Sequence, residues 1–487
     1  MNWLTAGQDQ DIGHKPPPEK GRRWQSYHSI WLWLFLAWML LYIDRSVTGP
    51  VVSWMIENQV AFLAEAPMPH ALGGLIGSMF FAGYMLTQFP AGHLGDRYGH
   101  KVMVVISLLW SAAATFLSGL VKSLNGFVAA RILTGLGEGA YYSNDRALVK
   151  EITPPRKLSM GLGVVFVGLA AGLTVATLVT PYLLDATASW LGPERAWTGP
   201  FLVFSLPTML MAVIIWKRMP ARTEEINYLA AGGRLLLYSL VFLAVLMSTF
   251  LLTLRFELGS VFQTVVVLVV ALALVAVIYW RLGDSNVLVL KDRNLNLVYL
   301  SAIPILYNLW FFGFWALLIV SESSHIGLTA AAVYAALFGI ASAIGYPLGG
   351  IIGDRARRRR GGCKWSYVWL SMAVSALVLM IGALLAMNGI DLLLLGALTF
   401  AMGVLFAAAQ TLNMTLAADL APVNKTASVF GMWNLIGEIG AVLSPVVSGA
   451  LRDLTGSWTI AIVLDAVLLL GSAGLVAMVR PIPVDLA

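Results

Sequence analysis

The feature that most constrains this chain is a series of fourteen apolar segments, each about 20 residues long or slightly longer. A helix of that length crosses the hydrocarbon core of a bilayer, because each residue adds about 1.5 Å of rise. Strands of an outer-membrane barrel would instead alternate in polarity over about 10 residues. The sequence therefore predicts an all-α polytopic membrane protein. The segments lie at 29–53, 71–92, 102–121, 126–147, 158–184, 199–217, 234–254, 258–280, 296–320, 329–352, 366–387, 391–415, 426–450 and 458–480.

The composition excludes a soluble globular protein. Of the 487 residues, 59% are hydrophobic and 11% are charged, whereas soluble domains are about 25% charged. The single cysteine, Cys363, and the six dispersed histidines give neither a disulfide framework nor a metal-ligand spacing. The sequence shows no nucleophile–base arrangement, so an enzyme is not expected.

The basic residues predict the orientation in the membrane. If the N-terminus is cytoplasmic, 25 of the 31 Lys and Arg residues fall on the cytoplasmic side, four fall on the opposite side and two lie within helices. This asymmetry follows the positive-inside rule. We expect both termini to be cytoplasmic and the protein to lie in the inner membrane of a bacterium. The net charge of +6 then reflects orientation, not nucleic-acid binding.

A six-residue motif, G-x-x-G-D-R, occurs at the end of the second segment and again at the end of the tenth. It places glycines where neighbouring helices approach closely and a carboxylate where it can pair with a helix N-terminus or an arginine. Its two copies suggest a cytoplasmic latch between helices, although a solvated turn is the simpler alternative. The residues assigned to this gate are Gly92, Gly95, Asp96, Arg97, Gly353, Asp354 and Arg355.

The repeat divides the chain into two halves of six helices, which is a known transporter design. The expected parts are a cytoplasmic tail (1–28), a first bundle (29–217), cytoplasmic linkers (218–295) carrying an inserted hairpin (234–280), a second bundle (296–480) and a second tail (481–487). The hairpin is almost without polar residues, so we expect it to be a peripheral pair that faces lipid, or an oligomer contact.

The stretch from Gly92 to Lys101 resembles the loop signature of the major facilitator superfamily, with His100 where that family usually has Arg or Lys. The resemblance covers 29–217 and 296–480. It implies two bundles that rock about a central cavity.

Five charged residues lie deep within apolar segments: Asp44, Arg45, Arg131, Glu138 and Glu438. A charge at the bilayer centre costs roughly 2.5–3.5 kcal/mol on insertion scales, so these groups must face one another or a hydrated cavity. A structural ion-pair network is one interpretation. The other assigns proton carriage to the carboxylates Asp44 and Glu138, and anion binding to the planar guanidinium groups of Arg45 and Arg131.

Tyr42-Ile43-Asp44-Arg45, together with Arg131 and Glu138 at a spacing of seven, resembles the anion:cation symporter branch of the superfamily. That branch includes sugar-acid:proton symporters and sialic-acid and glutamate carriers. The resemblance implies proton coupling at Asp44 and Glu138 and anion binding at the two arginines. Two features depart from the branch: the stretch 139–142, where an Ala-Pro-rich sequence is usual, and the inserted hairpin.

Further polar residues were assigned to the same site, although each is also a candidate for packing between helices. Asp465 is expected near the membrane interface and is left out of the site. The basic run 357–360 is expected to be solvated or to contact lipid phosphates. The additional candidate residues are Tyr42, Tyr141, Tyr307, Asn308, Gln410, Asn413, Asn434 and Glu438.

The sequence therefore predicts a monomeric transporter that imports a small organic carboxylate by proton symport. Its expected partners are the anion, protons and membrane lipids, with no cofactor and no metal. A fourteen-helix efflux antiporter is the first alternative, since fourteen helices are typical of a drug:proton antiporter branch. A membrane sensor that binds its ligand without moving it is the second. The carboxylate itself stays open among sugar acids, aromatic acids, dicarboxylates and siderophores.

Overall fold

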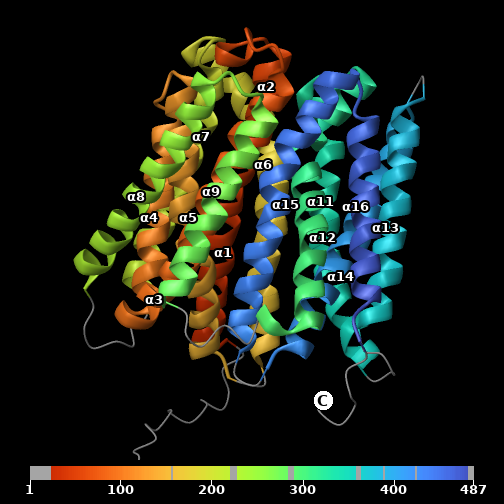
Figure 1. Ribbon diagram of the computed structural model, residues 1–487. Helices are drawn as coiled ribbons and strands as arrows, with labels where there is room; N and C mark the ends of the chain where they lie inside the picture. Colours follow the sequence, from red (N-terminus) through yellow and green to blue (C-terminus); the bar gives the residue numbers. More distant parts are fainter. Residues whose placement is uncertain are drawn as a thin grey trace, which may run out of the picture.

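A computed structural model describes residues 24–154, 157–219, 227–282, 290–357, 363–387, 390–422 and 425–480. Within these ranges the regular structure is helical (Figure 1). Two short 3-10 helices, Ala61–Leu63 and Ala196–Thr198, lie between longer α-helices. The α-helices are α1 (Ser26–Ser46), α2 (Thr48–Glu57), α3 (Pro69–Tyr98), α4 (His100–Ser118), α5 (Leu124–Ile152), α6 (Leu158–Leu191), α7 (Gly199–Arg218), α8 (Tyr228–Arg255), α9 (Ser260–Leu282), α11 (Arg293–Ser324), α12 (Leu328–Arg357), α13 (Lys364–Leu385), α14 (Leu392–Leu420), α15 (Thr426–Thr455) and α16 (Thr459–Ala477).

The described residues contain thirteen helical stretches that are long and apolar enough to cross a membrane, with α1 and α2 counted as one. The fourteenth predicted span is α5, whose 29 residues are long enough. It falls outside that set because it carries Arg131, Glu138, Asp145 and Arg146. It lies between α3 and α4, so protein surrounds its polar face. The predicted all-α fold with fourteen spans is confirmed.

Local signals set several helix ends. Asp292 accepts a hydrogen bond from the backbone N–H of Leu295 and so caps the start of α11. The same helix ends at His325, whose φ of 53° lies in the left-handed region. Between α1 and α2 the chain is nearly continuous at Val47. Pro50 has no N–H for the carbonyl one turn earlier, which weakens the helix at this junction.

The helices form two bundles and a hairpin (Figure 1). Helices α1–α7 pack on one another, and α11–α16 form the second group. The two bundles meet mainly through α3 against α15 and α6 against α12. The predicted architecture of two six-helix bundles with an inserted hairpin is confirmed.

Glycines bring α3 and α15 into backbone contact. A Cβ added at Gly74 would lie 2.2 Å from the carbonyl oxygen of Pro445, and one at Gly449 would lie 2.3 Å from that of His70. Neither position has room for a side chain without a shift of the opposite backbone. Small residues that permit such an approach are typical of helix contacts in membranes.

The hairpin α8–α9 lies at the edge of the molecule. In the most apolar window of each of its helices 28% of the residues are buried, against 94% in α11. Helix α8 packs on α3, α4 and α5, whereas α9 packs on both α3 and α15. The rings of Phe89 and Tyr279 meet with centroids 5.0 Å apart. The hairpin is therefore largely exposed, but α9 contacts both bundles.

Parts of the expected tails and loops lie outside the described residues. These are residues 1–23 of the N-terminal tail, the C-terminal tail at 481–487 and the basic residues 358–360. The roles expected for them stay predictions.

Candidate functional site

A small cavity lies between the two bundles. Its volume of about 20 Å³ holds about one water. Helices α1, α3, α5 and α6 of the first bundle and α11, α14 and α15 of the second provide its wall. The lining residues are Trp38, Tyr42, Tyr84, Tyr142, Arg146, Phe166, Leu169, Leu306, Leu309, Trp310, Gln410, Met414, Trp433, Asn434 and Glu438.

Arg45 and Glu138 form a buried ion pair beside this cavity. The Arg45 Nη2 and Nε atoms lie 3.0 and 3.2 Å from the same Glu138 carboxylate oxygen. Among the described residues, the second oxygen of Glu138 has no hydrogen-bond partner. The guanidinium lies over the rings of Tyr84 and Tyr42, at 4.2 and 4.6 Å from their centroids. Because both rings line the cavity, this pair is close to whatever occupies it.

Arg131 does not line the cavity and does not pair with Glu138, although the two share a face of α5. Its Nη2 donates to the hydroxyl groups of Ser118 and Thr134, at 2.6 and 2.9 Å. Its Nη1 donates to the backbone carbonyl of Asp44 and to the hydroxyl of Thr48, both at 3.3 Å. Arg131 therefore supports the junction between α1 and α2, where the helix is interrupted.

Asp44 is fully buried and lies close to Arg131 without a direct ion pair. One of its carboxylate oxygens accepts a hydrogen bond of 3.2 Å from Thr208 on α7. The other has no partner among the described residues. A buried ionised carboxylate requires several donors, and few are found for Asp44 among the described residues.

The second bundle contributes Glu438 to the cavity. Asn434, one helical turn away on α15, donates to Glu438 at 3.3 Å and to the side-chain oxygen of Gln88 at 3.1 Å. The contact with Gln88 on α3 joins the two bundles across the cavity. Glu438 retains one oxygen without a partner among the described residues.

Arg146 is a cavity residue that the sequence analysis missed. It was counted among the cytoplasmic cations because it lies near the end of a predicted span, yet the structure places it in the cavity wall. Asp145 accepts hydrogen bonds from it at 3.0 and 3.2 Å and also accepts one from Trp38. The guanidinium lies 4.3 Å from the ring centroid of Tyr142. Arg146 therefore lines this cavity, Arg45 contacts two of its rings, and each guanidinium lies beside a carboxylate and over tyrosine.

Four of the predicted site residues lie in the wall itself: Tyr42, Gln410, Asn434 and Glu438. Four others bond within their own bundles instead. Tyr141 donates to a carbonyl of α1, Tyr307 bonds Ser448, Asn308 bonds Asp465, and Asn413 bonds Ser301 and Trp433.

Asp465 is fully buried against α11, where it accepts a hydrogen bond from Asn308. This burial follows from the packing of α16 on α11 and α13. Its expected position near the membrane interface stays a prediction.

The first gate motif packs α3 on α5. A Cβ at Gly95 would lie 1.8 Å from the Asn144 side-chain oxygen. Asp96 is exposed, and its carboxylate lies 3.6 Å from Nε2 of His100. His100 also contacts Asn144 at 2.9 Å and Glu151 at 3.4 Å. The histidine at the unusual position of the motif therefore joins α3, α4 and α5.

The second gate copy lies at the corresponding end of α12. The backbone carbonyl of Gly353 lies 3.7 Å from the sulfur of Cys363. Asp354 and Arg355 are exposed. A gating role for either copy stays a prediction.

Comparison with known sequences identifies a family. The family model described as Major Facilitator Superfamily matches residues 34–290 and 298–486. The D-galactonate transporter of Escherichia coli is 23% identical over 456 residues, which cover 92% of this chain and 94% of that protein. The fold is also similar to that of a bacterial homologue of the lysosomal transporter Spinster, crystallised in an inward-facing and occupied conformation. Its TM-score is 0.66 at 14% identity, with 94% of this chain and 97% of that one covered.

Other relatives match over shorter stretches. A probable anion transporter 6 of Arabidopsis thaliana is 34% identical over 135 residues, 26% of each chain. The cis,cis-muconate transport protein of Acinetobacter baylyi is 29% identical over 180 residues, 37% of this chain and 41% of that protein. This chain thus spans well under two thirds of the length of these two relatives.

Proposed function

Because this chain belongs to the major facilitator superfamily and is a transporter rather than an enzyme, we propose that it imports a small organic carboxylate together with protons. The observation that carries this proposal is the buried Arg45–Glu138 pair beside the cavity, with its guanidinium over two of the rings that line it. The proposal places both termini in the cytoplasm of a bacterium, with a monomer as the transporting unit.

Charge balance at the cavity explains why an anion would need protons. Arg45 and Arg146 face three carboxylates, those of Glu138, Asp145 and Glu438. With all five groups ionised, the site has one negative charge in excess and repels a carboxylate. A proton on Glu138 removes its attraction for Arg45 and leaves that guanidinium free to bind the substrate. Binding of the anion and of the proton then favour each other.

The aromatic wall indicates the class of carboxylate. Tyr42 and Trp310 stack with an interplanar angle of 16°, and Tyr84, Tyr142, Trp38 and Trp433 complete the lining. Flat apolar faces beside guanidinium groups suit a planar acid, aromatic or conjugated, better than a polyhydroxy acid. Two relatives carry names of such a substrate class, cis,cis-muconate and 4-hydroxybenzoate.

Substrate entry requires the bundles to move. The cavity of about 20 Å³ is far below the roughly 300 Å³ of a typical small-molecule site. Separation of α3 from α15 and of α6 from α12, which form the main contacts between the bundles, would enlarge it. Alternating access by rocking of the two bundles is the corresponding mechanism.

A thermal-shift screen of the purified protein tests the proposal. The probes are 4-hydroxybenzoate, cis,cis-muconate and D-galactonate, compared with benzylamine and tetraphenylphosphonium. We expect the planar carboxylates to raise the melting temperature, and to do so more strongly at acidic than at alkaline pH, because the proton and the anion bind together.

Substitutions of two arginines test where the carboxylate binds. Arg45→Gln and Arg146→Gln should each weaken carboxylate binding by roughly 10-fold or more, since a hydrogen bond to a charged group contributes about 1.5–3 kcal/mol. Arg255→Gln, at an exposed arginine of α8, is the matched control and should bind as the wild type does. Stabilisation by the cationic probes alone would refute the proposal and favour the efflux antiporter.

A further inference from the structure

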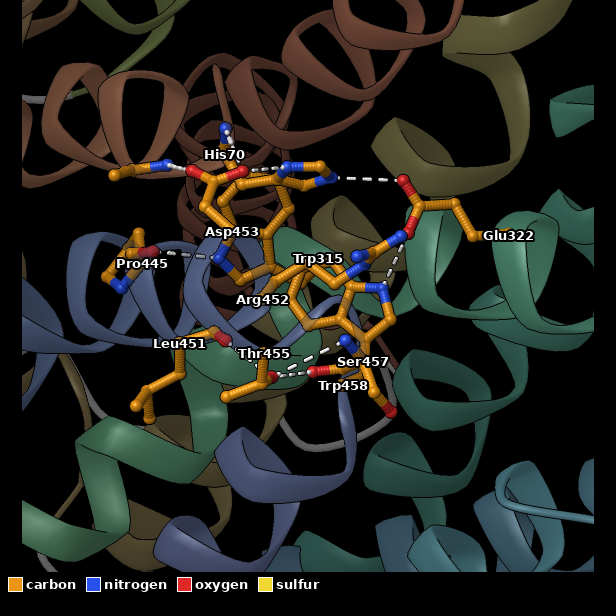
Figure 2. Close-up of polar contacts among 11 residues, drawn as sticks. His70, Trp315, Glu322, Pro445, Leu451, Arg452, Asp453, Thr455, Ser457 and Trp458 are labelled. Atoms are coloured by element: carbon orange, nitrogen blue, oxygen red, sulfur yellow. Dashed lines mark hydrogen bonds and ion pairs between the residues drawn. The ribbon is translucent and has the colours of Figure 1, made fainter. Parts of the chain in front are cut away.

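A cluster of polar side chains joins the two bundles at the outer end, defined here as the end opposite the G-x-x-G-D-R motifs (Figure 2). At its centre is His70, the second residue of α3. Its Nδ1 lies 2.6 Å from a carboxylate oxygen of Asp453 on α15, and its Nε2 lies 3.0 Å from one of Glu322 on α11. A single side chain of the first bundle thus bridges two carboxylates of the second.

Further contacts hold both carboxylates in place. Glu322 accepts from Nε of Arg452 at 2.8 Å and from the indole N–H of Trp458 at 2.9 Å. Asp453 accepts from the backbone N–H groups of His70 and Ala71, at 3.4 and 2.8 Å. A carboxylate of one bundle therefore caps the first turn of a helix of the other.

The two ring contacts of His70 require two hydrogens. A neutral imidazole has one N–H and one lone pair, and an ionised carboxylate has only lone pairs. With a neutral ring and two ionised carboxylates, one of the contacts would set lone pair against lone pair. Both contacts can be hydrogen bonds only if one additional proton is shared among His70, Asp453 and Glu322.

The charges around the imidazole ring of His70 also agree with one additional proton. From α11 and α15 the ring meets Glu322, Asp453 and Arg452, which sum to one negative charge without the proton and to none with it. Glu57 at the end of α2 lies within electrostatic range of Glu322 and of Asp185 on α6. It therefore adds negative charge near Glu322.

We propose that a proton bound at His70 closes the outer end of the transporter. The imidazolium ties α3 to α11 and α15, and loss of the proton breaks one bridge and leaves an excess negative charge between the bundles. Acid on the outer side then favours the state in which the outer end is closed. This inference rests on the alternating access of the proposed function, and it does not depend on which substrate is carried.

Distances between spin labels on the two bundles test the inference without substrate. Labels at Glu194→Cys, in the loop before α7, and Leu393→Cys, at the start of α14, lie at exposed outer positions of different bundles. Cys363→Ser removes the native thiol. The full-length protein in nanodiscs is measured on both sides of the range in which histidine ordinarily titrates. We expect the ratio of short to long distances to rise as the pH falls, by at most about 10-fold per pH unit, since one proton is bound.

Four variants distinguish the effect of the proton on His70 from the effect of side-chain packing. His70→Gln cannot carry a charge and should lose the pH dependence, with long distances throughout. His70→Arg carries a permanent charge and should give short distances at every pH. Asp453→Asn removes one bridge and should also weaken the pH response. His325→Asn changes an exposed histidine at the same end of α11 and should behave as the wild type, because asparagine tolerates the left-handed conformation.

Two results would overturn the inference. One is a distance distribution of the wild type that does not change with pH. The other is a pH response that persists in His70→Gln. If either result occurs while carboxylate binding is intact, the inference fails and the proposed substrate class stands. If carboxylate binding is absent while the pH response is intact, the proposed function fails and the inference stands.

Discussion

At the scale of single residues, the site depends on which charges are neighbours in space. Arg45 binds Glu138 from a different helix, while Arg131, seven residues before Glu138 on the same helix, binds hydroxyl groups and a carbonyl. The arginine over the cavity rings pairs with a carboxylate, whereas the hydrogen-bond partners of Arg131 are neutral groups. Under the proposed function, a proton on Glu138 would change the interactions of Arg45. We therefore regard Arg131 as a positioning residue for α1 and α2.

Glu138→Gln tests the coupling assigned to this pair. The amide keeps the size of the side chain and can still accept from Arg45, but it cannot take up or release a proton. We expect exchange of carboxylate across proteoliposomes to persist while accumulation driven by a pH gradient is lost.

The control for this experiment is Glu194→Gln, at an exposed loop position. Accumulation that is unchanged in Glu138→Gln would exclude the coupling role of Glu138 and leave Asp44, Asp145 and Glu438 as the buried carboxylates near the site.

At the scale of elements, hydropathy identified every span, because a helix in lipid must bury its backbone polar groups internally and display apolar side chains. The helix that departs most from this pattern, α5, also carries residues of the candidate site. Helix α5 contains Arg131, Glu138, Asp145 and Arg146 and can stay in the membrane because α3 and α4 cover it. The rotation of α5 about its axis, which brings Arg146 to the cavity, depends on these neighbours. The position of a span boundary in the sequence gives no information on this rotation.

The hairpin α8–α9 has no lining residue in the cavity, so its removal should leave the site intact. We expect a chain that lacks 230–285, closed by a short polar linker, to retain part of its transport activity. The loss should be only partial because α9 contacts both α3 and α15, and its absence changes how readily these helices separate.

Transport per correctly inserted molecule, measured in proteoliposomes, is the relevant quantity for the hairpin deletion. Complete loss of transport in a monodisperse, correctly inserted protein would show that the hairpin takes part in the transport cycle.

At the scale of the whole molecule, two bundles with few mutual contacts beyond α3–α15 and α6–α12 are suited to move as units. The polar cluster of His70 lies at one end of their interface, and the bond between Asn434 and Gln88 lies near its centre. Separation of the bundles at the height of either contact would break that contact. Under the two proposals above, the groups that bind protons and the groups that join the bundles are partly the same.

The distribution of basic residues predicts the orientation of this assembly, and cysteine labelling tests it. In a Cys363→Ser background, Glu194→Cys should react with an impermeant maleimide in intact cells. Lys150→Cys, at an exposed position near the end of α5, should react only after permeabilisation. The reverse pattern would place both termini outside and contradict the expected orientation.

The sequence by itself determined the membrane class, the number of spans, the two-bundle repeat and five of the buried charges. All of these follow from hydrophobicity, helix length and the cost of a charge in lipid, which are properties of local sequence. The tertiary structure decided the partners. It paired Glu138 with Arg45, placed Arg146 at the cavity, buried Asp465 against Asn308 and set His70 between Asp453 and Glu322. Such pairings depend on the rotation and depth of each helix against its neighbours, which arise from packing between residues far apart in the chain.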